Sequence, residues 1–124
     1  MNLLKFSFLL VISIFFTLCE KDDLEILQGG IWKLQDIKLN GFSVIEECYK
    51  DDTMQFNSSR VFFTFGVVKC SANDVNSDDT YTLLSDQEIL VIGNSRFQIS
   101  QLTETKLAIG RTNIIGEFIR EYSK

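Results

Sequence analysis

Gly30-Ile31-Trp32-Lys33-Leu34 opens the folded part of the chain. A glycine turn leads into the single tryptophan, and apolar and polar residues alternate from there to about Leu39. Successive side chains of a β-strand point to opposite faces, so this alternation predicts a strand with one buried face. Just upstream, residues 24–28 can form one helical turn with Gly29 as its stop.

The rest of the sequence predicts more strands at close spacing. Seven further segments have a strand-like pattern and are separated by turn residues: 53–56, 60–65, 80–84, 88–92, 96–102, 106–111 and 114–122. The second of these can continue to residue 68, with a bulge or bend at Gly66. About eight strands and no strong internal helix predict an all-β fold. We expect a single antiparallel up-and-down barrel, because short connections make sequence neighbours pair and closure removes edge strands.

Residues 1–18 are predicted to be a secretory signal peptide and to form a detached helix. Lys5 precedes a run of about a dozen apolar residues broken only by serine. A helix that spans a membrane needs about 20 apolar residues, whereas a basic start before a short apolar core is typical of a signal peptide. The alternative is an uncleaved membrane anchor.

The end of this run resembles the lipobox of bacterial lipoproteins. It reads Phe16-Thr17-Leu18-Cys19, with Leu18 where that motif usually has a small residue. The resemblance implies that Cys19 becomes the first residue of the mature chain and carries acyl chains, which would bind the protein to a membrane. The alternative is ordinary signal cleavage nearby, with Cys19 lost or left as a free thiol.

Charged residues follow this cysteine. Glu20-Lys21-Asp22-Asp23 resembles the signal that sends some Gram-negative lipoproteins to the outer face of the outer membrane. The alternative is a solvated acidic tether. We therefore expect a lipid-anchored outer-membrane protein, exposed at the cell surface. Its parts are a signal peptide at 1–18, an acidic tether with a short helical turn at 19–29, and a barrel at 30–124.

Composition restricts the functions that this chain can have. It has 12 basic and 17 acidic residues, a net charge of −5, which becomes −6 when Lys5 leaves with the signal peptide. This balance argues against a nucleic-acid partner, because such binding needs clustered Lys and Arg. There is no histidine, so the commonest general base and zinc ligand are absent. We expect a monomer without cofactor.

The pattern as a whole resembles the small lipocalin-like domains found on Gram-negative lipoproteins. Gly30-Ile31-Trp32 is similar to the Gly-x-Trp signature of lipocalins, and a cysteine before one strand and a second cysteine after the aromatic strand fit the same pattern. The resemblance implies a barrel in which Trp32 plugs the closed end. A basic residue from the last strands covers that tryptophan in lipocalins, and Arg111 and Arg120 are both candidates here.

Cys48 and Cys70 are predicted to form a structural disulfide. One precedes the second strand and the other follows the third, so a hairpin brings them together, and an envelope location permits oxidation. A catalytic thiol would need a base such as histidine. A metal site would need more ligands than two thiols.

Carboxylates in the loop at 71–79 suggest a calcium site. Oxygen ligands alternate from Asp74 to Asp78, but an EF-hand would need glycine at Asp79 and glutamate at Ser85. A solvated loop is the simpler interpretation, and the adjacent pairs at 22–23 and 51–52 are interpreted in the same way. We expect no catalytic, cofactor or metal residues.

Aromatic and aliphatic residues at alternate positions are predicted to fill the barrel. Val61, Phe63 and Phe65 share one face of their strand, as do the pairs at 81 and 83, 97 and 99, and 107 and 109. So many large side chains favour a filled or narrow lumen. The function expected is non-enzymatic binding or scaffolding. Alternatives are a small apolar ligand inside the barrel, or a protein partner such as a hydrolase at an exposed patch that contains Phe42, Tyr49 or Phe62.

Overall fold

The computed structural model describes residues 21–124. The predicted signal peptide and Cys19 lie outside the described residues, so their predictions stay untested. The ordered elements are α2 (Asp23–Gln28), β1 (Ile31–Leu39), β2 (Phe42–Ser43), η1 (Glu47–Tyr49), β3 (Thr53–Phe56), β4 (Arg60–Thr64), β5 (Ser77–Leu84), η2 (Ser85–Gln87), β6 (Ile89–Ile92), β7 (Ser95–Leu102), β8 (Lys106–Thr112) and β9 (Glu117–Ser123). Within this part of the chain, no helix has the length and apolar character needed to cross a membrane.

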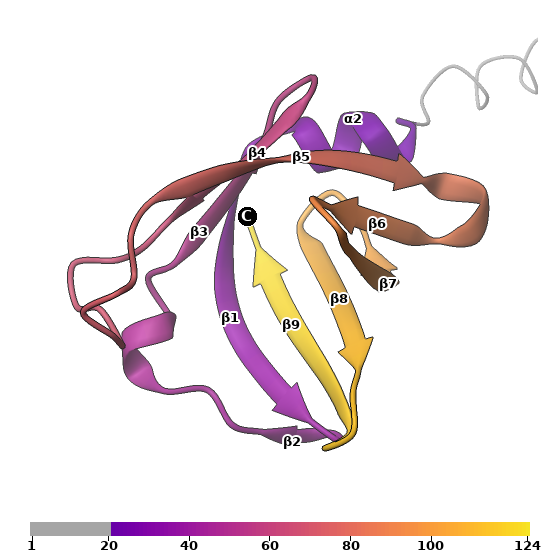
Figure 1. Cartoon of the computed structure of the whole chain (residues 1–124). Helices are drawn as coiled ribbons and strands as arrows, with labels where there is room; N and C mark the ends of the chain where they lie inside the picture. The colour runs from indigo at the N-terminus through magenta and orange to yellow at the C-terminus, as the bar shows by residue number, and fades with distance from the viewer. Residues whose placement is uncertain (1–20) are drawn as a thin grey trace, which may run out of the picture.

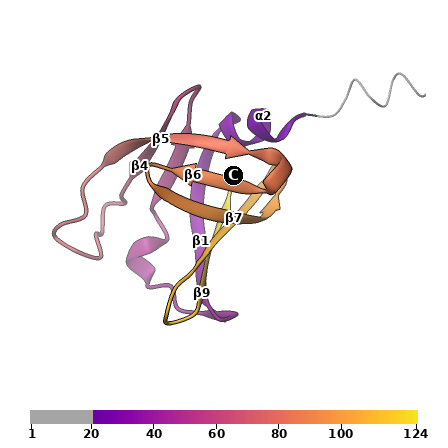
Figure 2. The same cartoon turned by 45° about the vertical axis from the view of Figure 1, so that its right-hand side comes forward.

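The strands form a closed antiparallel barrel, which confirms the predicted fold class (Figure 1). Their order is β2-β1-β3-β4-β5-β6-β7-β8-β9, and β1 also pairs with β9 to close the sheet. Eight strands make the barrel, while the two-residue β2 is an additional strand on β1. Figure 2 shows β5, β6 and β7 side by side across the front of the barrel.

Strand β1 has different partners along its length. Residues Ile31–Lys33 pair with β3, and Lys33 to Leu39 pair with β9 across an irregularity next to Gln35. On the β3 side, the backbone N–H of Leu34 still donates to the carbonyl of Asp52, 2.9 Å away. Beyond that point the strand diverges from β3 and meets β2 at Lys38 and Leu39, so the barrel widens toward this end.

Helix α2 caps the opposite end of the barrel (Figure 1). The side chain of Asp22 accepts from the backbone N–H of Glu25, which satisfies a free N–H group in the first turn. Leu27 is fully buried, and its carbonyl accepts from the indole N–H of Trp32 at 2.9 Å. Trp32 is itself fully buried. The helical turn and the core position of Trp32 are therefore as predicted.

The core lies in the capped half and consists of inward-facing residues from nearly every strand. It includes Trp32, Leu34, Met54, Phe56, Val61, Leu90, Ile99, Leu107, Ile109 and Tyr122. Phe63, Tyr81, Leu83 and Phe97 pack against this cluster while partly exposed. The faces expected from alternation are thus the ones that the structure buries.

Several strand boundaries differ from the sequence prediction, and three of them have a clear structural cause. The strand at 60–65 stops at Thr64, because the next N–H groups leave the sheet: Phe65 donates to the Asn76 side chain and Gly66 to Asp52. Gly66 is therefore part of a loop and not a bulge. Strand β5 starts at Ser77 and so takes the end of the expected polar loop, since Ser77 to Thr80 pair with β4.

The last strand begins at Glu117 and not at Ile114. Residues 113–116 instead form the turn between β8 and β9, because Asn113 exchanges backbone hydrogen bonds with Gly116. The Asn113 side chain also accepts from the N–H of Ile115 at 2.8 Å. Gly116 has a φ of +148°, which only glycine adopts easily.

Candidate functional site

The open half of the lumen contains a cavity of about 230 Å³. Its lining comes from every strand between β3 and β9: Met54, Phe63, Asp79, Ile92, Ser95, Phe97, Ile109, Arg120 and Tyr122. The sequence favoured a filled or narrow lumen. The structure agrees only for the capped half, because Phe63, Phe97 and Ile109, which were expected to fill the barrel, line this cavity instead.

A smaller cavity of about 100 Å³ lies next to it, toward β1 and the start of β3. The two cavities share Phe63, Arg120 and Tyr122. The smaller one adds Asp52 and Ser77 but also Leu34 and Phe65, so it is lined by both polar and apolar groups, as the larger one is. Arg120 therefore lies where the two cavities adjoin.

Polar groups around Arg120 are electrostatically coupled. Burial raises the pKa of the Asp52 carboxyl, against the hydrogen bond from the Gly66 N–H and the nearby Arg120 charge, which lower it. Burial also raises the pKa of the Tyr122 phenol, and Arg120 again opposes this effect. At neutral pH the site thus presents a fixed guanidinium beside a protonated phenol.

Arg111 faces the lumen from the neighbouring strand. Its guanidinium lies over the Phe97 ring, 5.5 Å from the ring centre. One of its nitrogens is 3.5 Å from the hydroxyl of Ser95, at the limit of a hydrogen bond. Phe97 and Ser95 both line the larger cavity, so Arg111 lies beside this cavity, while Arg111 itself lines a separate hollow over β7 and β8.

The prediction that Arg111 or Arg120 covers Trp32 is wrong. Lys124 covers it: its Nζ lies 4.1 Å from the centre of the Trp32 ring and donates to the carbonyl of Ile26 at 2.7 Å. Burial of the Lys124 ammonium group at this end of the barrel, beside Trp32, lowers its pKa. The reason is geometric. Ser123 pairs with Lys33 on β1, so the next residue, Lys124, lies level with Trp32, whereas Arg120 pairs with Ile37. Arg111 pairs with Phe118 and so lies still further from Trp32 along the barrel.

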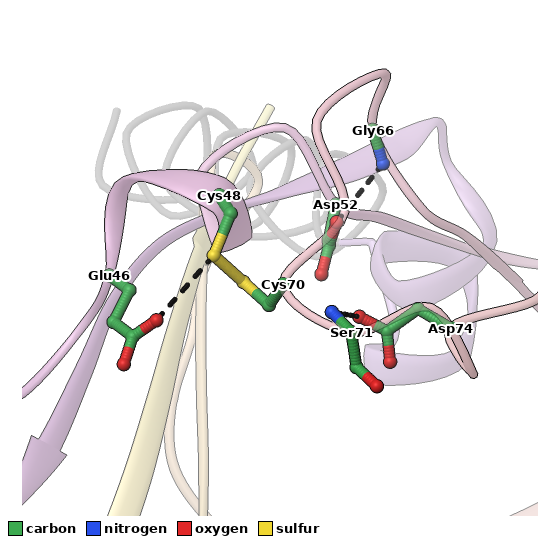
Figure 3. Close-up of a disulfide and its surroundings, with 7 residues drawn as sticks. All are labelled: Glu46, Cys48, Asp52, Gly66, Cys70, Ser71 and Asp74. Atoms are coloured by element: carbon green, nitrogen blue, oxygen red, sulfur yellow. Dashed lines mark hydrogen bonds between the residues drawn. A yellow bond between two sulfur atoms is a disulfide. The ribbon is translucent and has the colours of Figure 1, made fainter.

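The predicted disulfide between Cys48 and Cys70 is present. The two Cα atoms are 5.2 Å apart, and the bond joins η1 to the loop that follows β4 (Figure 3). Figure 3 also shows the Gly66 N–H donating to Asp52, a second link between the same two segments. Together these links hold the loop beside the wall that contains the smaller cavity.

A cluster of Glu46, Cys48 and Cys70 has the spacing of a metal site but not its chemistry. A Glu46 carboxylate oxygen lies 3.7 Å from the Cys48 sulfur. Both sulfurs are in the disulfide, whereas a metal-binding cysteine is a thiolate. These residues therefore offer one carboxylate and no second strong ligand.

The polar side chains of the loop at 71–79, which suggested a calcium site, accept hydrogen bonds from nearby backbone N–H groups. Asp74 accepts from the N–H of Ser71, Asn76 from Phe65, and Asp79 from Thr80. Asp78 pairs with Arg60 on β4. These side chains point to separate backbone groups, so they do not form one set of oxygen ligands.

An apolar tip projects from the open end of the barrel, made of Phe42, Ile114 and Ile115. Phe42 is 77% exposed, Ile115 is 66% exposed and Ile114 is fully exposed. Asn40 holds the two loops together, because it exchanges two hydrogen bonds of 2.9 Å with the backbone of Glu117. Figure 1 shows these loops at the end opposite α2.

The other aromatic residues expected at an exposed patch do not join this tip. Phe62 is exposed on β4, whereas Tyr49 packs partly buried against the core.

A hollow of about 250 Å³ also lies over β7 and β8 and includes Arg96, Gln98 and Thr112. Arg96 and Gln98 alternate with the inward-facing Phe97 and Ile99, so most of this hollow lies outside the lumen, although Phe97 and Arg111 also line it.

Comparisons with family models, with curated proteins and with solved structures gave no match. The assignment of the candidate site therefore rests on the geometry of this chain alone.

Sequence reasoning missed Arg111 and Arg120 as residues of the lumen. Their signal was the alternation itself, because 107, 109 and 111 share one face of β8, and 118, 120 and 122 share one face of β9.

Proposed function

We propose that this chain is a lipid-anchored, non-enzymatic lipocalin-like protein that binds a small ligand in its barrel. The observation that supports this best is the cavity of about 230 Å³ in the lumen. Ligand pockets are concave, mostly apolar and equipped with a few polar groups. Met54, Phe63 and Ile109 supply the apolar wall here, and Arg120 and Ser95 supply polar groups. Cavities of about 300–1,000 Å³ hold drug-sized ligands, so we expect a smaller ligand.

The absence of histidine supports a function without catalysis. The disulfide supports an oxidising location, since such bonds are rare in a reducing cytosol. Both facts are consistent with export and with anchoring at Cys19 in the outer membrane.

The test of ligand binding is titration of the ¹⁵N-labelled domain, residues 21–124, with octan-1-ol. We expect saturable shifts of the amide signals of cavity residues such as Phe63 and Ile109. Ser95→Phe should abolish these shifts by filling the cavity. Thr82→Phe, a matched change at an exposed position on β5, should leave them unchanged. Absence of saturable shifts in the wild type would contradict the proposal.

The test of anchoring is mass spectrometry of the full-length protein extracted from Gram-negative membranes. We expect an acylated N-terminal Cys19, and we expect Cys19→Ser to leave an unprocessed or unmodified chain. Protease treatment of intact cells then reports whether the domain faces outward. A mature chain that starts elsewhere without acyl groups would contradict the anchor.

A protein partner is the second candidate function, supported by the apolar tip. Three large apolar side chains are exposed at this tip, and exposed apolar patches on a protein surface can mark interaction sites. A photo-crosslinking residue placed at Ile114 in intact cells should give one discrete adduct. The same residue at Thr82 should not. Identical adducts at both positions, or none at either, would argue against this function.

A further inference from the structure

The loop that follows β4 exposes two valines and a lysine in a row. Val67 is 99% exposed, Val68 is 65% exposed, and Lys69 is exposed beside them. Among the acidic residues of 21–124, none lies within 4.0 Å of the Lys69 ammonium group. This short segment therefore presents an apolar pair and a free positive charge to the outside of the molecule.

Both ends of this segment are attached to the barrel. At its start, the carboxylate of Asp52 accepts from the backbone N–H of Gly66 at 3.1 Å. At its end, Cys70 is bonded to Cys48 in η1 (Figure 3). Residues 67–69 thus form a short arch between two fixed points.

Two further side chains hold the flanks of the arch. Asn76 accepts from the N–H of Phe65 at 2.9 Å, and Asp74 accepts from the N–H of Ser71 at 3.0 Å. Backbone groups just before and just after the arch are therefore bonded within the protein. A loop that is ordered before it meets a partner loses less conformational entropy on binding.

We propose that the arch binds in the active site of a trypsin-like serine protease and inhibits it, with Lys69 in the specificity pocket. Trypsin selects basic residues because its pocket contains an aspartate, and the ammonium group of Lys69 complements that charge. Val67 and Val68 lie on the N-terminal side of Lys69, where a substrate chain also contacts the enzyme. This interaction does not involve the lumen, so it goes beyond the ligand binding proposed above.

The disulfide explains why the arch inhibits the protease and is not simply digested. Attack of the catalytic serine on the Lys69 carbonyl forms an ester and releases the amino group of Cys70. Because Cys70 stays bonded to Cys48, this amine remains beside the ester. The amine then attacks the ester, which restores the peptide bond and frees the serine hydroxyl. Hydrolysis by water competes poorly with a nucleophile held at such high effective concentration.

The experiment measures inhibition of trypsin by the full-length protein, purified with its disulfide intact, against a chromogenic arginine amide. We expect competitive inhibition with an inhibition constant below about 1 μM. Lys69→Ala should weaken inhibition about 100-fold or more, because the aspartate of the pocket loses its cation. Lys69→Phe should lose inhibition of trypsin and gain inhibition of chymotrypsin, whose pocket is hydrophobic.

Lys106→Ala is the matched control, since it removes an exposed lysine from β8, and it should inhibit trypsin as the wild type does. The double variant Cys48→Ser/Cys70→Ser should be cleaved after Lys69 and should no longer inhibit. Circular dichroism before each assay checks that the variants are folded.

The proposal is overturned if the wild type does not inhibit trypsin, whether or not trypsin cleaves it. It is also overturned if Lys69→Ala inhibits as well as the wild type, or if Lys69→Phe inhibits neither protease. Undiminished inhibition by the double cysteine variant would overturn the role of the disulfide. None of these results depends on whether octan-1-ol binds in the lumen.

Discussion

The Nζ atom of Lys124 lies 4.1 Å from the centre of the Trp32 ring, so the two ends of the described chain meet at one end of the barrel. The same ammonium group donates to the carbonyl of Ile26 at the end of α2. One cation therefore interacts with an aromatic face and with a carbonyl in the last turn of α2. This arrangement closes the end of the barrel that is remote from the candidate site.

Lys124→Met should destabilise the domain by about 1–2 kcal/mol, because it removes the cation–π contact and the hydrogen bond to Ile26. The aliphatic stem is kept, so lost packing contributes little. Urea denaturation followed by tryptophan fluorescence measures the change. Lys106→Met removes an exposed lysine from β8 and should have almost no effect. Equal effects of the two changes would mean that Lys124 acts only through net charge.

Trp32→Ala should destabilise the domain by about 3–5 kcal/mol, because it truncates a fully buried side chain. It also leaves the carbonyl of Leu27 without the indole N–H. Circular dichroism during chemical denaturation measures the change, since the fluorescent probe is lost. Ile31→Ala, at the exposed neighbouring position, should cost less than about 1 kcal/mol. A neutral result at Trp32 would show that the end cap adds no stability.

Reduction of the Cys48–Cys70 disulfide should lower stability by about 3 kcal/mol, since the cysteines are 22 residues apart. Denaturation curves with and without reductant measure this difference. The double variant Cys48→Ser/Cys70→Ser should match the reduced wild type and should not respond to reductant. Peptide mapping without reductant should recover the linked pair, and two free thiols in the exported protein would refute the bond in vivo.

The free energy of unfolding of the Asp52→Asn variant should increase relative to that of the wild type as pH rises. Burial raises the pKa of Asp52, so folding opposes its ionisation. The contribution of Asp52 to stability therefore falls as pH rises from about 3.9, the unfolded value, through the higher native pKa. Denaturation at pH 3 and pH 7 measures the trend, and Asp86→Asn, on exposed η2, controls for loss of one charge. The opposite trend would mean that Arg120 outweighs burial.

The sequence predicted the barrel well because local alternation and tertiary burial agree on most strands. The segments at 31–39 and 53–56 were predicted with their observed limits. The errors come from pairing that sequence alone does not reveal. Polar residues at 77–79 become strand because β4 offers them partners. Apolar Ile114 and Ile115 become a turn because Asn113 and Gly116 close it.

The candidate site was predictable only in part. Alternation correctly assigned inward-facing residues on β4, β5, β7 and β8, but it was not extended to Arg111 or to β9. Whether inward side chains leave a cavity depends on the diameter of the closed barrel and on which half they fill. The partner of Trp32 likewise depends on where the chain passes after β9. Such properties arise from the assembled sheet and have no signal within one strand.

Closure through β1 and β9 has a consequence for how the protein is made. Lys38 and Glu121 pair across this seam at 3.1 Å, although they are 83 residues apart in sequence. A chain that emerges N-terminus first has β1 long before β9, and contacts between such distant segments form slowly. During that interval β1 is an unprotected edge that can associate with other chains. The period between synthesis of the first and last strands is therefore when this protein is most vulnerable to aggregation.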